Sequence, residues 1–122
     1  MSTITPTDTI TIALSVTDRA RTAAWFQKHL GFEQVFSTDE AGWTEIATNT
    51  PGVTIGFGDM QTVTPGSTVP VFGVADCDAS RAALEAEGVQ FDGDTIEVPG
   101  MVKLASFFDP DGNPLMLAET LS

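Results

Sequence analysis

The chain has 122 residues, and hydrophobic side chains make up 42% of them, which is enough for a packed core and excludes a disordered chain. Acidic residues outnumber basic ones 17 to 5, giving a net charge of −12. This balance excludes the basic face on which a nucleic-acid partner depends. The same negative field favours cationic ligands, although it serves solubility equally well.

Two further features indicate where the protein resides. No apolar run is long enough to span a bilayer, and the opening residues MSTITPTDT lack the basic and apolar regions of a signal peptide. Cys77 is the only cysteine, so no intrachain disulfide forms, as is typical of a reducing compartment. We therefore expect a cytoplasmic protein with no membrane partner.

The first half of the chain predicts a strand, a helix and three more strands. A run of β-branched and apolar residues over 9–16 predicts the first strand. Asp18 suits the N-cap of the helix, which carries an apolar stripe and ends at Gly31. Turn signals separate three further strands, predicted at 32–37, 43–48 and 53–57.

The second half repeats this order after a polar linker at 61–68. The triplet Val74-Ala75-Asp76 matches Val16-Thr17-Asp18, and each triplet ends a strand and begins a helix that stops at a glycine. The predicted elements of this half are a strand at 69–74, a helix at about 78–87, a short strand at 89–91, and strands at 101–108 and 115–119. Residues 92–100 are predicted to form an acidic, mobile loop at the rim of a pocket.

The segment FFDPDGNPLMLAE, residues 107–119, is a strand, a tight turn and a second strand. Together with VTD before a helix ending HLGF, and VAD before a helix ending AEGV, it resembles the vicinal oxygen chelate superfamily of glyoxalases, extradiol dioxygenases and bleomycin-resistance proteins. The resemblance implies an α+β fold in one domain, 1–122, built from two tandem βαβββ modules at about 8–60 and 69–120. Their curved mixed sheets would surround a cleft, and a homodimer is implied as well.

Metal-dependent members of the superfamily carry His or Glu at four positions, which the matched motifs place here at Thr11, Gly56, Val69 and Glu119. Only Glu119 has a side chain that binds transition metals. The single histidine, His29, falls in the last turn of the first helix, where its charge suits the helix dipole. We therefore expect no transition-metal site and no cofactor. A carboxylate-only site for a hard cation such as Mg²⁺ stays open as an alternative, although no Asp/Glu cluster has the loop spacing for it. A nucleophilic Cys77 is disfavoured because no histidine lies near it in sequence.

Small or apolar residues at these positions predict an open, apolar pocket with Trp43 as the side chain that stacks on a ligand. Trp43 and Glu45 share one face of their strand and Ile46 lies on the other, and the pattern leaves open which face points inward. Glu119 shares a face with Leu115 and Leu117, so it lines the cleft if they do and is otherwise solvated. The predicted ligand-binding residues are Thr11, Ala13, Phe36, Trp43, Gly56, Val69, Val71, Met101, Phe108 and Glu119.

The leading hypothesis is a metal-independent protein that binds and sequesters a small molecule, such as a cationic antibiotic, in the manner of the bleomycin-resistance branch. The alternative is a metal-free isomerase, cyclase or lyase in which Glu119 or Glu45 is the base. A metalloenzyme that handles glutathione or fosfomycin, and a pure interaction module, rank behind these two.

Overall fold

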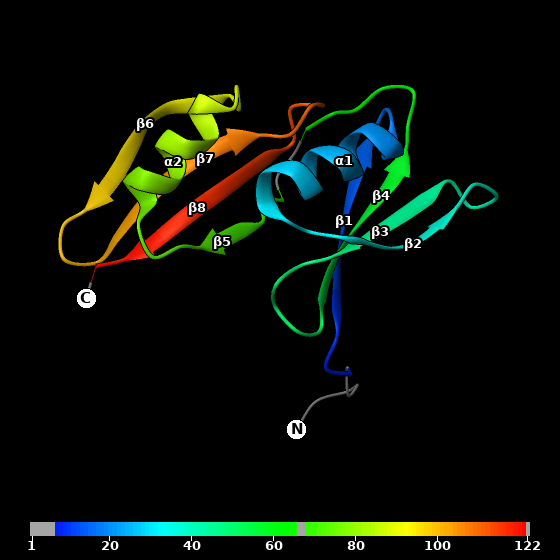
Figure 1. Ribbon diagram of the computed structural model, residues 1–122, viewed down its shortest axis with the longest axis horizontal. Helices are drawn as coiled ribbons and strands as arrows, with labels where there is room; N and C mark the ends of the chain where they lie inside the picture. Colours follow the sequence, from blue (N-terminus) through cyan, green and yellow to red (C-terminus); the bar gives the residue numbers. More distant parts are fainter. Residues whose placement is uncertain (1–6, 66–67, 122) are drawn as a thin grey trace. The chain divides into compact units, whose positions relative to one another are not determined.

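The computed structural model describes residues 7–65 and 68–121, which form two compact units divided between Val63 and Thr64. Each unit runs strand, helix, strand, strand, strand (Figure 1). The predicted α+β fold of two tandem βαβββ modules is confirmed. Residues 66 and 67 of the predicted linker lie outside the described residues. Neither helix in the described part of the chain has the length and apolar character that crossing a bilayer requires.

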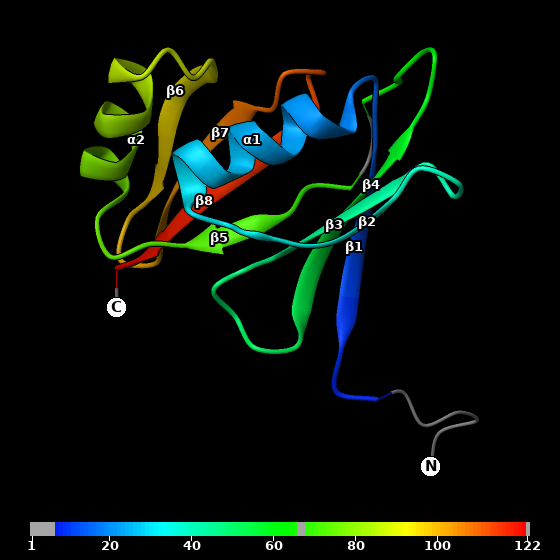
Figure 2. The same cartoon turned by 45° about the vertical axis from the view of Figure 1, so that its right-hand side comes forward.

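The first unit is a mixed sheet of four strands with a helix on one face. Its elements are β1 (Ile10–Val16), α1 (Arg19–Leu30), β2 (Gln34–Thr38), β3 (Trp43–Ala47) and β4 (Val53–Asp59). The strands lie in the order β1-β4-β3-β2. β1 runs parallel to β4, beside which it lies in Figure 2, and the other neighbours are antiparallel.

The core of this unit lies between α1 and the sheet. Phe26 of α1 is fully buried, and its ring lies 5.3 Å from that of Phe57 on β4. Ile46 and Ile55 are fully buried beneath the same helix. Because side chains alternate along a strand, the residues between these core positions point away from α1. We call that surface the open face of the first sheet.

The second unit repeats the arrangement. Its elements are β5 (Val71–Gly73), α2 (Cys77–Ala86), β6 (Phe91–Val98), β7 (Val102–Phe108) and β8 (Pro114–Thr120). The strands lie in the order β5-β8-β7-β6, with β5 parallel to β8. α2 packs on β7 and β8, and the core between the helix and the sheet includes Leu84 of α2 with Phe107, Leu115 and Leu117 of the strands.

The prediction of a loop at 92–100 was wrong, because β6 extends through Val98. The pair Asp92-Gly93 reads as a turn, but Gly93 adopts a φ of 66° within the strand, and the pairing with β7 shifts register between Asp92 and Ile96. A bulge therefore absorbs the turn signal without ending the strand. The actual turn is confined to the residues around Pro99 and Gly100.

Within each unit, the helix begins with the same kind of contact to the last strand of that unit. The first residue of α1, Arg19, donates its backbone N–H to Asp59 Oδ1 at 3.2 Å. The first residue of α2, Cys77, donates its backbone N–H to Glu119 Oε1 at 2.8 Å. In each unit, the carboxylate near the end of the last strand satisfies an N–H that the helix cannot pair internally. Its negative charge also suits the helix dipole.

Candidate functional site

The indole of Trp43 covers Gly56 on the open face of the first sheet. A Cβ added at Gly56 would overlap Cζ2 and Cη2 of Trp43, so the ring occupies the space that a side chain would need. The indole N–H donates to Glu45 Oε1 at 3.1 Å. Trp43 is therefore fixed by the sheet below it and by a hydrogen bond at its edge, and its second ring face is turned away from the sheet.

Burial shows which face of β3 points toward the core, a question that the alternation of its side chains left open. Ile46 is fully buried and Thr44 nearly so, and both lie beneath α1. Trp43 and Glu45 are half-buried and lie on the open face. Glu45 is the only charged side chain that the described strands place on this face.

Five of the predicted ligand-binding residues come together on this open face. Pairing across the strands forms a row of Phe36, Glu45, Gly56 and Ala13. Phe36 is 54% exposed at one end of the row. Thr11 lies two residues before Ala13 on β1, on the same face, and its hydroxyl is 2.8 Å from the hydroxyl of Thr54. The row thus presents small, uncharged groups beside one aromatic platform and one carboxylate.

In the second unit the predicted residues are more dispersed. Val71 lies on the face of its sheet away from α2, opposite Met116, and is 54% exposed. Phe108 is half-buried at the end of β7, opposite Pro114. Val69 is half-buried just before β5, and Met101 lies in the turn between β6 and β7, 64% exposed.

Glu119 lies on the opposite side of its sheet from Val71. Leu115 and Leu117 are buried beneath α2, and Glu119 shares their face, with its carboxylate on the N–H of Cys77. Glu119 was expected to line a cleft only if Leu115 and Leu117 did so, and these two leucines are instead covered by α2. On β8 the residues that face away from α2 are Pro114, Met116, Ala118 and Thr120.

Cys77 is fully buried at the start of α2. Burial raises the pKa of its thiol, and the charges of Asp78 and Glu119 raise it further. The thiolate, which is the nucleophilic form, is thus disfavoured. His29 packs its ring against Trp25, with the ring centres 5.1 Å apart.

The four positions at which the superfamily implies a divalent metal do not supply one with ligands. Thr11 is hydrogen-bonded to Thr54, Gly56 is covered by Trp43, Val69 is apolar, and Glu119 is used at α2. Across residues 7–65 and 68–121, no three His, Cys, Asp or Glu side chains are placed so that they could hold a metal ion. Transition metals require such donors, so the residues present do not fit the metal.

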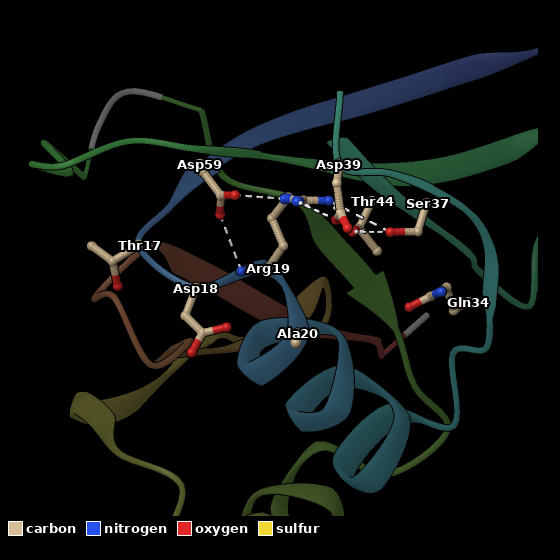
Figure 3. Close-up of a pocket in the computed structure, with 9 residues that line it drawn as sticks. All are labelled: Thr17, Asp18, Arg19, Ala20, Gln34, Ser37, Asp39, Thr44 and Asp59. Atoms are coloured by element: carbon tan, nitrogen blue, oxygen red, sulfur yellow. Dashed lines mark hydrogen bonds and ion pairs between the residues drawn. The ribbon is translucent and has the colours of Figure 1, made fainter. Parts of the chain in front are cut away.

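On the other side of the first sheet lies a polar hollow of about 460 Å³, shown in Figure 3. At its centre is Arg19, a residue that the sequence analysis did not single out. Its side chain is 13% exposed and donates to Asp59 Oδ2 at 2.6 Å and to Asp39 Oδ1 at 3.1 Å. The lining residues are Thr17, Asp18, Arg19, Ala20, Gln34, Ser37, Asp39, Thr44 and Asp59.

This hollow is organised around contacts within the protein. Arg19 Nη1 donates to the carbonyl oxygen of Trp43 and to Thr44 Oγ1, both at 3.0 Å. The hydrogen bonds to Asp59 and Asp39 raise the pKa of the guanidinium. The network joins the start of α1 to β2, β3 and β4. Because the cation is already paired with two carboxylates, the hollow has little left with which to hold an anion.

Two βαβββ units of this order, each with a parallel pair formed by its first and last strands, define a glyoxalase-type fold. The profile described as the Glyoxalase/Bleomycin resistance protein/Dioxygenase superfamily matches residues 9–117, and the chain belongs to this superfamily. A comparison with curated proteins gives no match.

Solved structures of the same fold include proteins with several stated roles. TnmS3, an antibiotic-binding protein from Streptomyces sp. CB03234, is 24% identical, with a TM-score of 0.77, and the alignment covers 98% of this chain and 99% of that one. A glyoxalase/bleomycin resistance protein from the same organism is 26% identical, with a TM-score of 0.68 and coverage of 88% and 96%. The fosfomycin resistance protein FosX from Listeria monocytogenes, solved with Mn(II) and sulfate, is 19% identical, with a TM-score of 0.75 and coverage of 98% and 92%.

Proposed function

We propose that this protein binds a small organic molecule on the open face of the first sheet without using a metal, and that it acts by sequestering that molecule. The observation that carries the proposal is the indole of Trp43, seated on Gly56 and hydrogen-bonded to Glu45. A flat apolar ring held in place beside a carboxylate is a surface for stacking and charge pairing. The antibiotic-binding relative TnmS3 supports a binding role on this fold.

Two properties of the chain favour a cationic ligand such as a cationic antibiotic. The net charge of −12 attracts cations from solution and speeds their capture. Glu45 supplies a negative charge on the binding face itself. Apolar contact then provides the holding energy, at about 2.5 kcal/mol for every 100 Å² of apolar surface buried.

The protein is further proposed to act as a homodimer. Large apolar side chains remain uncovered within each unit, among them Ile10 at 64% exposed and Ile96 at 61% exposed. Apolar surface of this kind commonly pairs with another protein surface. Light scattering during size exclusion is expected to give twice the mass of one chain, and a single-chain mass would contradict this part of the proposal.

The alternative enzyme, a metal-free isomerase, cyclase or lyase, now depends on Glu45. Its carboxylate lies on the same face as the stacking surface, whereas that of Glu119 is engaged at α2. Turnover of a bound compound that is lost in Glu45→Gln would support this alternative. A compound that is bound and released unchanged supports sequestration.

A melting-temperature screen tests the proposal. Chelator-treated protein is mixed with cationic and neutral antibiotics and metabolites, and a ligand that binds only the native state raises the melting temperature. We expect a stabilising ligand whose effect is lost in Trp43→Leu and kept in Trp25→Phe, the control change at the other tryptophan. Stabilisation that requires added metal, or that survives Trp43→Leu unchanged, would overturn the proposal.

A further inference from the structure

The spacing and charge of the side chains on the open face of the first sheet indicate which kind of ligand it can bind, and this inference rests on the proposed function. Pairing across the strands places Phe36, Glu45 and Gly56 in one row, and the ring of Trp43 covers Gly56. Glu45 therefore lies between two aromatic side chains, Phe36 on one side and the indole on the other. Neighbouring strands are about 4.8 Å apart, so the distance from Phe36 to Gly56 across β3 is about 10 Å. A single aromatic ring is too short to reach across that span, so the site suits a compound of at least two fused rings.

The indole is prepared for contact before any ligand arrives. Gly56 leaves room for the ring to rest on the backbone of β4, and the bond to Glu45 Oε1 restrains its rotation. A side chain that is already ordered loses little conformational entropy when a ligand stacks on it. The indole N–H is also used by Glu45, so Trp43 has no donor left to offer a neutral or anionic ligand.

The ring face of Trp43 and the carboxylate of Glu45 both attract positive charge to this face. The ring face of an indole is electron-rich and attracts cations, and the carboxylate of Glu45 lies at its edge. The nearby side chains of Thr11, Ala13 and Phe36 carry no charge. A neutral ring would gain the stacking contact alone, whereas a cationic ring of the same shape gains stacking and charge pairing together.

We propose that Phe36, Trp43 and Glu45 form a recognition site for planar aromatic cations of at least two fused rings. Glu45 is the residue that sets the preference for charge, and Trp43 is the residue that sets the preference for a flat ring. Gly56 contributes by leaving the space in which the indole lies.

The test uses three probes that separate shape from charge: N-methylquinolinium, a flat cation; quinoline at neutral pH, a flat neutral ring of nearly the same size; and tetramethylammonium, a cation without a ring. In the Trp25→Phe protein, Trp43 is the only tryptophan, so quenching of its emission reports contact at this site. We expect N-methylquinolinium to bind about tenfold more tightly than quinoline, a difference typical of a cation on a desolvated ring beside a carboxylate. Tetramethylammonium is expected to bind more weakly than either.

Two matched variants locate the source of the preference. Glu45→Gln keeps an acceptor for the indole N–H but removes the charge, and is expected to abolish the preference for N-methylquinolinium while quinoline binding stays unchanged. Glu40→Gln removes the same charge from an exposed turn and is expected to keep the preference. Tighter or equal binding of quinoline, equal effects of the two variants, or no quenching by N-methylquinolinium would overturn this inference. The proposed function would still be judged separately, by whether any compound in the melting-temperature screen depends on Trp43.

Discussion

The indole of Trp43 and the missing side chain of Gly56 occupy the same place on the first sheet. Glu45 pairs directly with Gly56, and Trp43 is its diagonal neighbour across the strand pair. Diagonal neighbours such as Trp43 and Gly56 are close enough for a large ring to reach over the glycine and fill the gap that it leaves. The indole can therefore lie here only because residue 56 is a glycine. The ring in turn fills the space that a side chain of residue 56 would have packed.

This relationship predicts that Gly56→Ala displaces the indole. The added methyl group would overlap the ring, and overpacking of this kind costs about 1–3 kcal/mol in the free energy of unfolding. Urea unfolding measures the cost, and the emission of Trp43 is expected to shift as the ring moves toward solvent.

The control is Gly58→Ala on the same strand face. A Cβ there would lie 3.9 Å from Cε3 of Trp43, which is ordinary contact. Neither glycine has a positive φ, so the backbone tolerates alanine at both. Equal stability of the two variants would show that the indole does not depend on the space at Gly56.

A second prediction concerns Glu119, whose carboxylate caps α2 at Cys77. Glu119→Ala is expected to reduce the free energy of unfolding by about 0.5–2 kcal/mol, the usual cost of losing a cap at a helix start. Glu119→Gln keeps an oxygen that can accept the bond and is expected to lose less. Ligand binding is expected to be unchanged in both variants. Normal stability combined with lost binding would instead assign Glu119 to the binding site.

The repeat and the turn made the fold predictable, whereas the site was predictable only in part. The alternation of side chains identified Trp43 and Glu45 as sharing a face but could not say which face α1 covers, since Ile46 and Trp43 are both good core residues. The local pattern around Glu119 gave no sign of its partner, because that partner is a backbone N–H far away in sequence at Cys77. Long-range contacts of this kind leave no spacing to recognise.

Arg19 shows the same limit. It follows an N-cap aspartate, where an arginine has no special meaning, and its partners Asp39 and Asp59 come from two different strand ends. The sequence contains only five basic residues against 17 acidic ones. This imbalance is the one feature of the sequence that indicates pairing of Arg19 with a carboxylate.

A third prediction arises from Thr22 on α1. In the described part of the chain, its hydroxyl oxygen is buried and has no hydrogen-bond partner. Valine has the same shape without the polar atom, so Thr22→Val is expected to raise the free energy of unfolding by about 1 kcal/mol, as judged by urea unfolding. Thr22→Ser keeps the unpaired hydroxyl and removes the methyl group, and is expected to destabilise. A loss of stability in Thr22→Val would mean that the hydroxyl has a partner in solution.

A fourth prediction uses the buried turn residue Asp109. Its carboxylate accepts the backbone N–H groups of Asp111 and Asn113, at 2.9 and 2.8 Å. Burial raises the pKa of the Asp109 carboxyl, and these hydrogen bonds only partly oppose the rise. The folded protein thus holds this proton more tightly than the unfolded chain. The protonated Asp109 carboxyl therefore adds to the free energy of unfolding. This contribution is complete below the pKa of Asp109 in the unfolded chain and is lost as the pH rises through its higher pKa in the folded protein.

The measurement is the free energy of unfolding of the wild type minus that of Asp109→Asn, taken from about pH 3 to about pH 7. We expect this difference to turn against the wild type as the pH rises, because asparagine at this position does not titrate. The effects of the other carboxylates cancel in the subtraction. A difference that does not change with pH, or one that moves in favour of the wild type, would contradict the assignment.

The proposed function requires that binding occurs at Trp43 and needs no metal. It is tested most directly by titrating the Trp25→Phe protein, after exhaustive chelation, with the compound that gives the largest melting-temperature shift, while following the emission of Trp43. We expect saturable quenching with an affinity that added Mn²⁺, Ni²⁺ or Zn²⁺ leaves unchanged. Quenching that appears only after one of these ions is restored, with one ion bound per chain, would contradict it.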